Sequence, residues 1–438
     1  MERTTELDKE IIAKAEAMQE KMTKRRRDIH KHPESGWTEF RTASLVIKEL
    51  KNLGYTVLMG ASVNNPSEQQ GVPDTSVLEK CMKRAISEGA DPDLVKKMAG
   101  GLTGVVGIMD TGRPGPTVAL RFDMDCNDVD EAADEKHRPY KEGFSSVHKH
   151  CMHACGHDGH TTAGLGVAEL LAEYKDMLCG RIKLIFQPAE EGVRGARCML
   201  AAGVADDVDY LLASHLMPPK VGWLAYSLTG ILATTKFNAD FTGVPAHAGA
   251  NPEIGHNAML AAATAAINIQ AIPRHSAGIS RVNVGVLNAG TGRNVVPANA
   301  HLEIETRGET TEINEYVYKR AVEILEGAAK MQEVSVKITR TGSASGADSS
   351  PELAEHIRKT AERLGQFDKL EPAFVGASED CSWFMERVQK NGGQAVYIAV
   401  GGSQAAVNHN NWFDFDERAL VLDVEILTAV AMELLMKK

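Results

Sequence analysis

The chain has 438 residues, a formal net charge of −11 at pH 7 and 43% hydrophobic residues, a composition typical of a folded globular protein. This length exceeds one typical hydrophobic core, so we expect two or more domains. The negative charge argues against nucleic acid as a partner, and no apolar run reaches the ~18 residues that a membrane span needs. A small anionic substrate is still allowed, because local basic residues can dominate a binding site.

The cysteines and the first residues indicate the compartment. Seven cysteines are scattered along the chain, an odd number without a dense short-range framework, which is typical of reduced thiols. Residues 1–22 form a charged helical pattern that lacks the apolar core of a secretory signal. We therefore expect a cytoplasmic protein.

The first part of the chain is predicted to be helical. Residues 5–50 suit two helices separated by a turn near Pro33, and a short strand follows at 55–59. His30 and His32 lie beside the turn, where they could bind a metal, but we favour a structural role for both.

Residues 60–102 form an unusual segment inserted between two predicted strands. The segment is rich in loop-forming residues and contains predicted helices at 75–88 and 91–98. It either shapes or covers a pocket or is a plain surface elaboration.

The next two predicted strands, at 103–109 and 117–122, are separated by the hairpin signal of residues 112–116. The second strand runs directly into Asp123 and Asp125. These acids are either metal ligands or acceptors that orient a ligating histidine, and we favour the second role.

The stretch 151–160 concentrates more metal-binding side chains than any ordinary core element needs. Thiolate and imidazole are the usual ligands of zinc-like divalent metals. The spacing is not that of a zinc finger, and taken alone the pair Cys155 and His157 fits inert core residues about as well as ligands. The stretch contains Cys151, His153, Cys155, His157, Asp158 and His160.

Three further segments each place a carboxylate or imidazole after an apolar run predicted to be a strand. They carry Glu190 with Glu191, His215 and His409. Helices are predicted between the strands, at 161–174 and 193–202, which indicates a mixed or parallel sheet. Functional groups gather beyond the carboxyl ends of such strands, so we predict that the four segments meet at one metal centre.

A different pattern occupies residues 234–340, which read strand, helix, strand, strand, helix, strand, the split βαβ order. We therefore predict an α/β catalytic domain, 1–228 and 343–438, with a mixed, mostly parallel sheet and helices on both faces. The inserted ferredoxin-like α+β domain spans 229–342. A further helix is predicted to open at Ser378.

Amide hydrolysis suits the predicted centre. It needs a nucleophilic water, a base, a charge stabiliser and a proton for the leaving amine, and paired metals supply the first and third. Glu190 and Glu191 can divide the remaining work, one binding metal while the other transfers the proton. The alternative for this pair is a solvent-exposed acidic turn.

These motifs together resemble the aminoacylase/carboxypeptidase G-type dinuclear metallopeptidases. The similarity is greatest to the amidohydrolase branch, which includes hippurate and auxin-conjugate hydrolases, and within it to the aminobenzoyl-glutamate hydrolases. It covers nearly the whole chain and rests on residues 152–158, 187–192, His215, His409-Asn410, 60–102, 122–125, 233–237 and 292–297.

The resemblance implies a role for each candidate in the catalytic domain. Cys155 would bridge two metal ions, and Glu190 would be the general base and acid. Asp125 or Asp158 would orient a ligand. The ligand set would be completed by His157, Glu191, His215 and His409.

The resemblance also implies a dimerisation or lid role for the inserted domain. His247 would stabilise the oxyanion, often in the partner's active site. Asn294 and Arg307 would hold the substrate carboxylate, which arginine contacts in bidentate fashion. The alternative for Arg307 is an ordinary cation at a strand end.

The chain differs from the carboxypeptidase relatives at one metal-binding motif. Carboxypeptidase relatives have a His-x-Asp motif where this chain has Asp123 and Asp125, which leaves His157 to take that ligand's place. Thiolate favours zinc, whereas this branch often works with manganese, so we expect two divalent ions, Mn²⁺ preferred and Zn²⁺ possible.

The expected function is a metal-dependent amidohydrolase that cleaves an N-aroyl or N-acyl amino acid. The preferred substrate is p-aminobenzoyl-glutamate, and the alternative is a hippurate-type or other N-acyl amino acid. A non-catalytic subunit of a heteromeric hydrolase is the alternative of another class, disfavoured because no ligand or base is missing. We expect a homodimer or a heteromer with a related chain, and no nucleic-acid or membrane partner.

Overall fold

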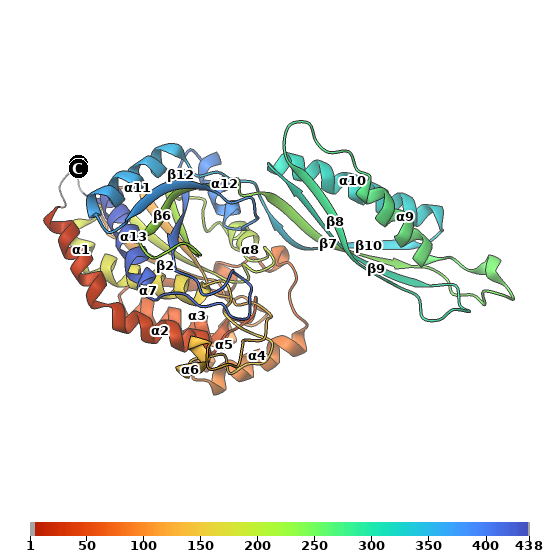
Figure 1. The fold of residues 1–438 in the computed structure, drawn as a ribbon, viewed down its shortest axis with the longest axis horizontal. Coiled ribbons are helices and arrows are strands. Elements are labelled where there is room, and N and C mark those ends of the chain that lie inside the picture. The colour runs from red at the N-terminus through yellow and green to blue at the C-terminus, as the bar shows by residue number, and fades with distance from the viewer. Residues whose placement is uncertain (1–4, 437–438) are drawn as a thin grey trace. The chain divides into compact units, whose positions relative to one another are not determined.

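The computed structural model describes residues 5–436, which divide into two compact units (Figure 1). The first unit holds residues 5–229, 348–375 and 383–436, and the second holds 230–347 and 376–382. None of the described helices combines the length and apolarity required to cross a bilayer.

An eight-stranded sheet forms the centre of the first unit, in the order β1-β2-β4-β3-β5-β12-β6-β11. The neighbours β4, β3, β5 and β12 run parallel, whereas β1, β2 and β6 pair antiparallel with β2, β4 and β12. This confirms the predicted mixed, mostly parallel sheet. The strands are β1 Thr56–Met59, β2 Val105–Asp110, β3 Thr117–Asp123, β4 Arg181–Gln187, β5 Tyr210–Met217, β6 Trp223–Thr229, β11 Lys369–Phe374 and β12 Gln394–Gly401.

Two helices of this unit are buried almost along their whole length, because apolar and small residues occur on all their faces. They are α7 and α13, which pack on each other, and α1 and α2 lie against them. The helices are α1 Glu6–Ala17, α2 Gln19–Lys31, α3 Phe40–Asn52, α4 Thr75–Ser87, α5 Pro92–Lys97, α6 Arg138–Lys141, α7 His157–Glu173, α8 Ala196–Ala201, α11 Pro351–Leu364, α12 Ser382–Lys390 and α13 Ala419–Leu435.

The predicted hairpin between β2 and β3 is wrong, because β4 lies between these two strands. The connecting loop instead accepts hydrogen bonds from the start of β4, at 2.8 Å from Gly180 N to Arg113 O and 2.9 Å from Arg181 N to Pro116 O. Every residue of β3 is buried, which suits a central strand with parallel partners on both sides.

Several predicted boundaries also shift. Helix α7 begins at His157 rather than 161, because Gly156 adopts a φ of +88° and ends the preceding loop. Helix α12 begins at Ser382 rather than Ser378, and α8 is shorter than the predicted 193–202. Strands β6 and β11 were not predicted; β11 is an edge strand interrupted by Pro372, which weakens its sequence pattern.

The second unit follows the predicted order of strands and helices. Its sheet runs β10-β7-β9-β8 with antiparallel neighbours throughout, the split βαβ arrangement. Alanines of α9 and the apolar face of α10 pack on one side of the sheet, against Phe237, Phe241 and Leu302. The elements are β7 Ala233–Thr242, α9 Ala258–Gln270, β8 Ser280–Ala289, β9 Asn299–Gly308, α10 Thr311–Met331 and β10 Ser335–Ala344.

Glu425 is a destabilising group in the core of the first unit. It lies on α13 with 1% of its surface exposed, and its Oε2 has no hydrogen-bond partner among the described residues. Burial, together with the charge of Glu16, raises the pKa of Glu425 to about 8. Below the unfolded pKa of about 4.5 this acid is neutral in both states, and the fold keeps its full stability. As pH rises from there toward about 8, the unfolded chain releases the proton more readily than the folded protein, so the free energy of unfolding falls.

We therefore expect Glu425→Gln to raise the melting temperature by ~3 °C or more at pH 8, because the amide carries no charge to bury. At pH 5 the difference should nearly vanish. Melting curves of both proteins across this pH range test the effect, with Asp176→Asn, at an exposed position, as the control. An increase of the same size at both pH values would contradict this account.

Candidate metal centre

The predicted metal-binding segments meet at the carboxyl ends of the four parallel strands. The segment after β4 carries Glu190 and Glu191, β5 carries His215 near its end, and the loop after β12 carries His409. The fourth segment enters α7 through Cys155 and His157. His215 lies inside β5 rather than beyond the predicted strand end, and the other donors follow the strands as expected.

Cys155, His157 and His215 form one group of three buried donors. Their ligand atoms all lie within 4.8 Å of one another, and Cys155 Sγ is 3.5 Å from His215 Nε2. The two ring nitrogens of His157 are buried without a hydrogen-bond partner among the described residues. A buried ring nitrogen without a hydrogen bond costs free energy, and a metal ion bound at Nε2, the nitrogen that faces away from Asp125, would remove that cost.

Cys155, Glu191 and His409 form a second group, again with ligand atoms within 4.8 Å of one another. His409 Nε2 lies 3.3 Å from Glu191 Oε1. Because Cys155 belongs to both groups, its sulfur lies between two neighbouring sets of donors. This geometry and this mixture of thiolate, imidazole and carboxylate fit two adjacent divalent ions with a shared thiolate.

The protonation of His215 suits a ligand. Burial, reinforced by His160, lowers the pKa of His215 to about 3, so its imidazole is neutral. Its Nδ1 donates a hydrogen bond to the carbonyl of Leu216 at 2.7 Å, which leaves the Nε2 lone pair facing Cys155.

The turn of Glu190 and Glu191 has the geometry that lets two adjacent acids face one site. Ala189, which precedes them, has a φ of +50°, a conformation rare for a residue with a side chain. Glu190 Oε2 lies 4.0 Å from His157 Nε2, and the three residues Glu190, Glu191 and His157 bring ligand atoms within 4.8 Å. Since Glu190 is 9% exposed, the alternative of a solvent-exposed acidic turn is wrong.

Asp125 holds this turn in place. Its Oδ1 accepts the amide proton of Glu190 at 3.0 Å, and its Oδ2 accepts that of Glu191 at 2.9 Å. The same carboxylate lies 3.4 Å from His157 Nδ1. One buried acid thus holds the backbone of both glutamates and lies against the imidazole of His157, which are the contacts that an orienting role would use.

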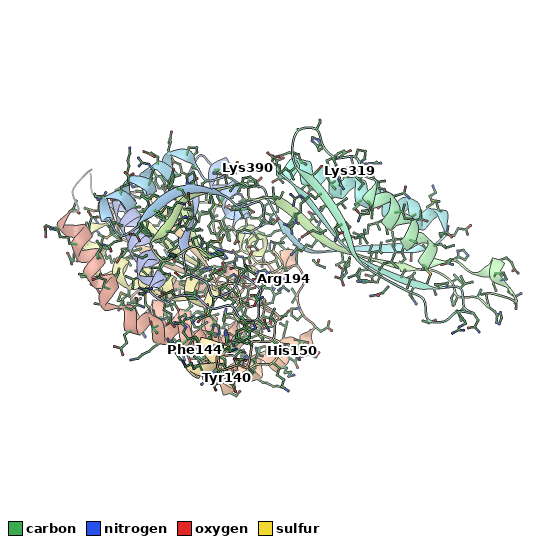
Figure 2. The ribbon with its side chains drawn as sticks, in the orientation of Figure 1. Tyr140, Phe144, His150, Arg194, Lys319 and Lys390 are labelled. Atoms are coloured by element: carbon green, nitrogen blue, oxygen red, sulfur yellow. The ribbon has the colours of Figure 1, made fainter. Side chains whose placement is uncertain are left out.

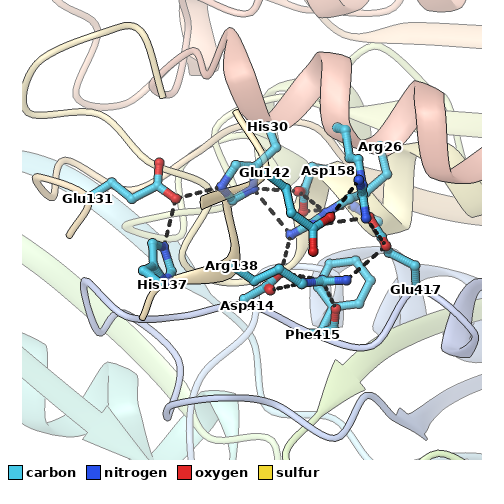
Figure 3. A network of polar contacts seen from close by, with 12 residues as sticks. Arg26, His30, Glu131, His137, Arg138, Glu142, Asp158, Asp414, Phe415 and Glu417 are labelled. Carbon is cyan, nitrogen blue, oxygen red and sulfur yellow. Dashed lines mark hydrogen bonds and ion pairs between the residues drawn. The ribbon is translucent and has the colours of Figure 1, made fainter. Parts of the chain in front are cut away.

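Asp158 belongs to a different set of contacts (Figure 3). It accepts hydrogen bonds from Arg26 Nε at 2.7 Å and from His30 Nδ1 at 2.8 Å, both on α2. Burial opposes its ionisation, but these cations keep its pKa well below the ordinary range. Its described contacts therefore attach α2 to the start of α7 rather than to a donor, and His30 takes the structural role expected for it. The buried network also includes Glu131, His137, Arg138, Asp414 and Glu417.

The inserted segment 60–102 lies against the acidic turn. Arg194, labelled in Figure 2, donates to the carbonyls of Glu191 at 2.8 Å and of Gly71 at 3.1 Å. Trp37 Nε1 donates to the carbonyl of Gln70 at 2.8 Å. These contacts connect the segment to the backbone beside the donors, which favours a role in shaping the site.

Three candidates lie in the second unit. His247 is exposed, and its Nδ1 accepts the amide protons of Gly249 and Ala250. Asn294 lies beside it, since its carbonyl accepts the amide proton of Ala248 at 3.0 Å. Arg307 makes a bidentate contact, 3.0 Å for each bond, with Glu305 on the same strand.

The structure adds two residues that the sequence analysis did not assign. Asn408 Nδ2 lies 3.4 Å from Cys155 Sγ, and Asn127 Oδ1 accepts the amide proton of Ala154 at 3.2 Å. Each stands next to a recognised motif, Asn408 before His409 and Asn127 two residues after Asp125. Their position beside these motifs could therefore have identified both residues as candidates from the sequence.

Two histidines of the central stretch lie outside the five-donor set. His153 is fully buried, and burial lowers its pKa to about 3, so it is a neutral core residue. His160 Nδ1 lies 2.7 Å from Asp123 Oδ1, and its Nε2 accepts the amide proton of Leu216. His160 thus connects β3 to the end of β5.

Comparison with known proteins agrees with this geometry. The family model described as "Peptidase family M20/M25/M40" matches residues 119–433. The "Indole-3-acetyl-aspartic acid hydrolase" of Enterobacter agglomerans and a "p-aminobenzoyl-glutamate hydrolase" subunit of Escherichia coli (strain K12) are each 49% identical to this chain. Both alignments cover 94% of this chain and 95% of the relative. The crystal structure of an aminobenzoyl-glutamate utilization protein from Klebsiella pneumoniae has a TM-score of 0.84 at 42% identity and covers 98% of each chain. The predicted resemblance is confirmed.

We expect Asp125→Asn to weaken binding of Mn²⁺ by about 10- to 100-fold, because an amide nitrogen would replace one of the two acceptors of the Glu190 and Glu191 protons. Calorimetric titration of the metal-free protein measures this. Asp130→Asn, at an exposed position, is the matched control and should bind as the parent does. Unchanged affinity in Asp125→Asn would rule out the orienting role.

Proposed function

This chain belongs to peptidase family M20/M25/M40 and is a metal-dependent amidohydrolase, and we propose that it cleaves the amide bond of an N-aroyl amino acid, preferentially p-aminobenzoyl-glutamate. The observation that carries the proposal is the position of Glu190. This acid stands beside two donor groups that share Cys155, while its neighbour Glu191 belongs to one of them.

Cys155, His157, Glu191, His215 and His409 would hold two divalent ions. Such ions activate a water and polarise the scissile carbonyl. We propose Mn²⁺ as the preferred metal and Zn²⁺ as a possible one. Imidazole and carboxylate suit both, and the single thiolate is the donor that favours Zn²⁺.

Glu190 is the proposed general base and acid. Its carboxylate would accept a proton from the attacking water and pass it to the nitrogen of the leaving amine. Asp125 contributes by holding the backbone of Glu190 through the 3.0 Å hydrogen bond. A base fixed in this way loses little freedom when the substrate arrives, which lowers the barrier.

His247, Asn294 and Arg307 are the proposed contacts to substrate. His247 Nε2 would donate to the oxyanion that forms at the scissile carbonyl. Asn294 and Arg307 would hold the substrate carboxylate, for which Arg307 must exchange its present partner Glu305.

The second unit supports a dimeric arrangement of these residues. Asn294 precedes β9, and Arg307 stands near the far end of this strand, about 25 Å from its first residue, Asn299, at the rise of an extended strand. One copy therefore cannot place both residues on one substrate carboxylate, so we propose that they come from different copies.

Strand β8 is an unpaired edge of the sheet, and Leu260 and Ile267 of α9 are 51% and 73% exposed. An open edge beside exposed apolar residues suits pairing with a second copy. We propose a homodimer, and the alternative is a heteromer that this chain forms with a related one.

The substrate proposal has a competitor of the same chemical class. The relative named for indole-3-acetyl-aspartic acid is as similar as the relative named for p-aminobenzoyl-glutamate. Both compounds join an aromatic acyl group to an acidic amino acid. Measuring kcat/KM for both, with hippurate and an N-acetyl amino acid included, decides between them, and we expect the highest value for p-aminobenzoyl-glutamate.

We expect Glu190→Gln to lower kcat by about 10²- to 10⁴-fold while the bound metal is retained, because an amide cannot accept the proton. Mass spectrometry of the metal content and a p-aminobenzoate release assay give the two measurements. Glu191→Gln is the matched variant and should lose metal as well as activity. Substantial turnover by Glu190→Gln would disprove the proposed mechanism.

We further expect complementation between two inactive variants. Co-expression of Glu190→Gln with His247→Ala should restore about one quarter of the parent activity, since half of the dimers are mixed and each mixed dimer contains one intact site. Each variant alone should remain inactive. A mixture as inactive as its parts would show that His247 does not serve the partner's site.

A further inference from the structure

Cys126 and Cys151 form a close pair of thiols outside the donor groups. Their sulfur atoms are 3.0 Å apart, and the side chains are 3% and 6% exposed. Cys126 follows β3, and Cys151 begins the stretch that carries the proposed ligands. Mutual hydrogen bonds of 3.0 Å between the backbones of Asn127 and Met152 fix the two segments side by side.

The two sulfurs have unequal surroundings. Cys151 Sγ lies 3.5 Å from Ser35 Oγ and 3.4 Å from the carbonyl of Pro33. The hydrogen bond from Cys126, aided by His148 and Ser35, lowers the pKa of Cys151 to about 5, whereas burial raises that of Cys126. The opposite directions of these pKa shifts make Cys151 the more nucleophilic sulfur of the pair.

We propose that Cys126 and Cys151 are a modification site, a dithiol that a small peroxide oxidises to a disulfide. The pair is already within about 1 Å of bonding distance, since a disulfide bond is ~2.05 Å long. The backbone pairing of Asn127 with Met152 keeps both segments in register, so closure needs only a small shift.

The reaction takes two steps. The Cys151 thiolate attacks one oxygen of hydrogen peroxide, so an S–O bond forms, the O–O bond breaks and the released hydroxide takes a proton to become water. The sulfur of Cys126 then attacks the sulfenic sulfur of Cys151, forming the S–S bond and breaking the S–O bond. The leaving hydroxide takes the thiol proton of Cys126, so two thiols and one peroxide give one disulfide and two waters.

The site adjoins the metal centre through the backbone. Asn127, next to Cys126, accepts the amide proton of Ala154, which directly precedes Cys155. Met152, next to Cys151, belongs to the same short pairing. The proposed disulfide would therefore lie beside the part of the chain that positions Cys155.

The test is peptide mapping of the metal-loaded full chain after treatment with a few equivalents of hydrogen peroxide at pH 7. Trypsin cleaves after Arg121, Lys136, Lys149 and Lys175, so Cys126 lies in peptide 122–136 and Cys151 in peptide 150–175. After alkylation of the remaining thiols, we expect these peptides to be joined, two hydrogens lighter, and separated by dithiothreitol. Peptide 150–175 also contains Cys155, so fragment ions that divide Met152 from Ala154 must assign the bond to Cys151.

Three cysteine variants test the two reaction steps separately. In Cys126→Ser the second step is blocked, so we expect a sulfenic acid at Cys151 that dimedone captures. Cys151→Ser should give neither product, and Cys198→Ser, which removes another buried thiol, should cross-link as the parent does. The proposal is overturned if the parent protein forms no cross-link. It is also overturned if the disulfide joins Cys151 to Cys81, or if Cys155 rather than Cys151 is the bonded cysteine of peptide 150–175. The readout is covalent, so its failure is distinct from failure of the proposed hydrolysis.

Discussion

The Asp125 carboxylate is the contact on which the proposed metal centre depends. It accepts both amide protons of the Glu190 and Glu191 turn and faces His157, so it connects the ends of β3 and β4 to the start of α7. A hydrogen bond to a charged acceptor contributes about 1.5–3 kcal/mol, and leaving such a group buried without its partners costs more. The arrangement is therefore held by a few strong contacts rather than by the metal alone.

Two of the segments that carry the metal-binding candidates contain strained backbone. Ala189 and His409 have φ values of +50° and +67°, conformations that cost roughly 1–3 kcal/mol in a residue with a side chain. Each is fixed by surrounding contacts. The amide of His409 donates to the carbonyl of Ala154 at 2.7 Å, and that of Ala189 donates to the buried carboxylate of Glu39 at 2.8 Å. The backbone at these points directs the adjacent acids and the exposed side chain of His409 toward one place.

The sequence allowed the donors to be found because parallel strands bring their carboxyl ends together. Once Cys155, Glu191 and His409 are each placed after a buried strand or before a helix, their convergence follows from topology. The pairing of β4 between β2 and β3 did not follow, since the loop that joins β2 to β3 has the same turn residues as a hairpin. The partners of Asp158 were also beyond prediction, because Arg26 and His30 are more than a hundred residues away and carry no periodic signal.

The Arg26 network has a consequence for any shortened version of the chain. Helix α2 supplies the Arg26 guanidinium, which forms ion pairs with Asp158, Asp414 and Glu417, three acids that are almost completely buried. Removing the amino-terminal helices would leave Asp158 without Arg26 and His30, and it would leave Asp414 and Glu417 with Arg138 as their described cation. Buried carboxylates that lose a counter-ion in this way are poorly tolerated. The first helices are thus part of the smallest folding unit, and a tag or fusion at that end should be joined ahead of them.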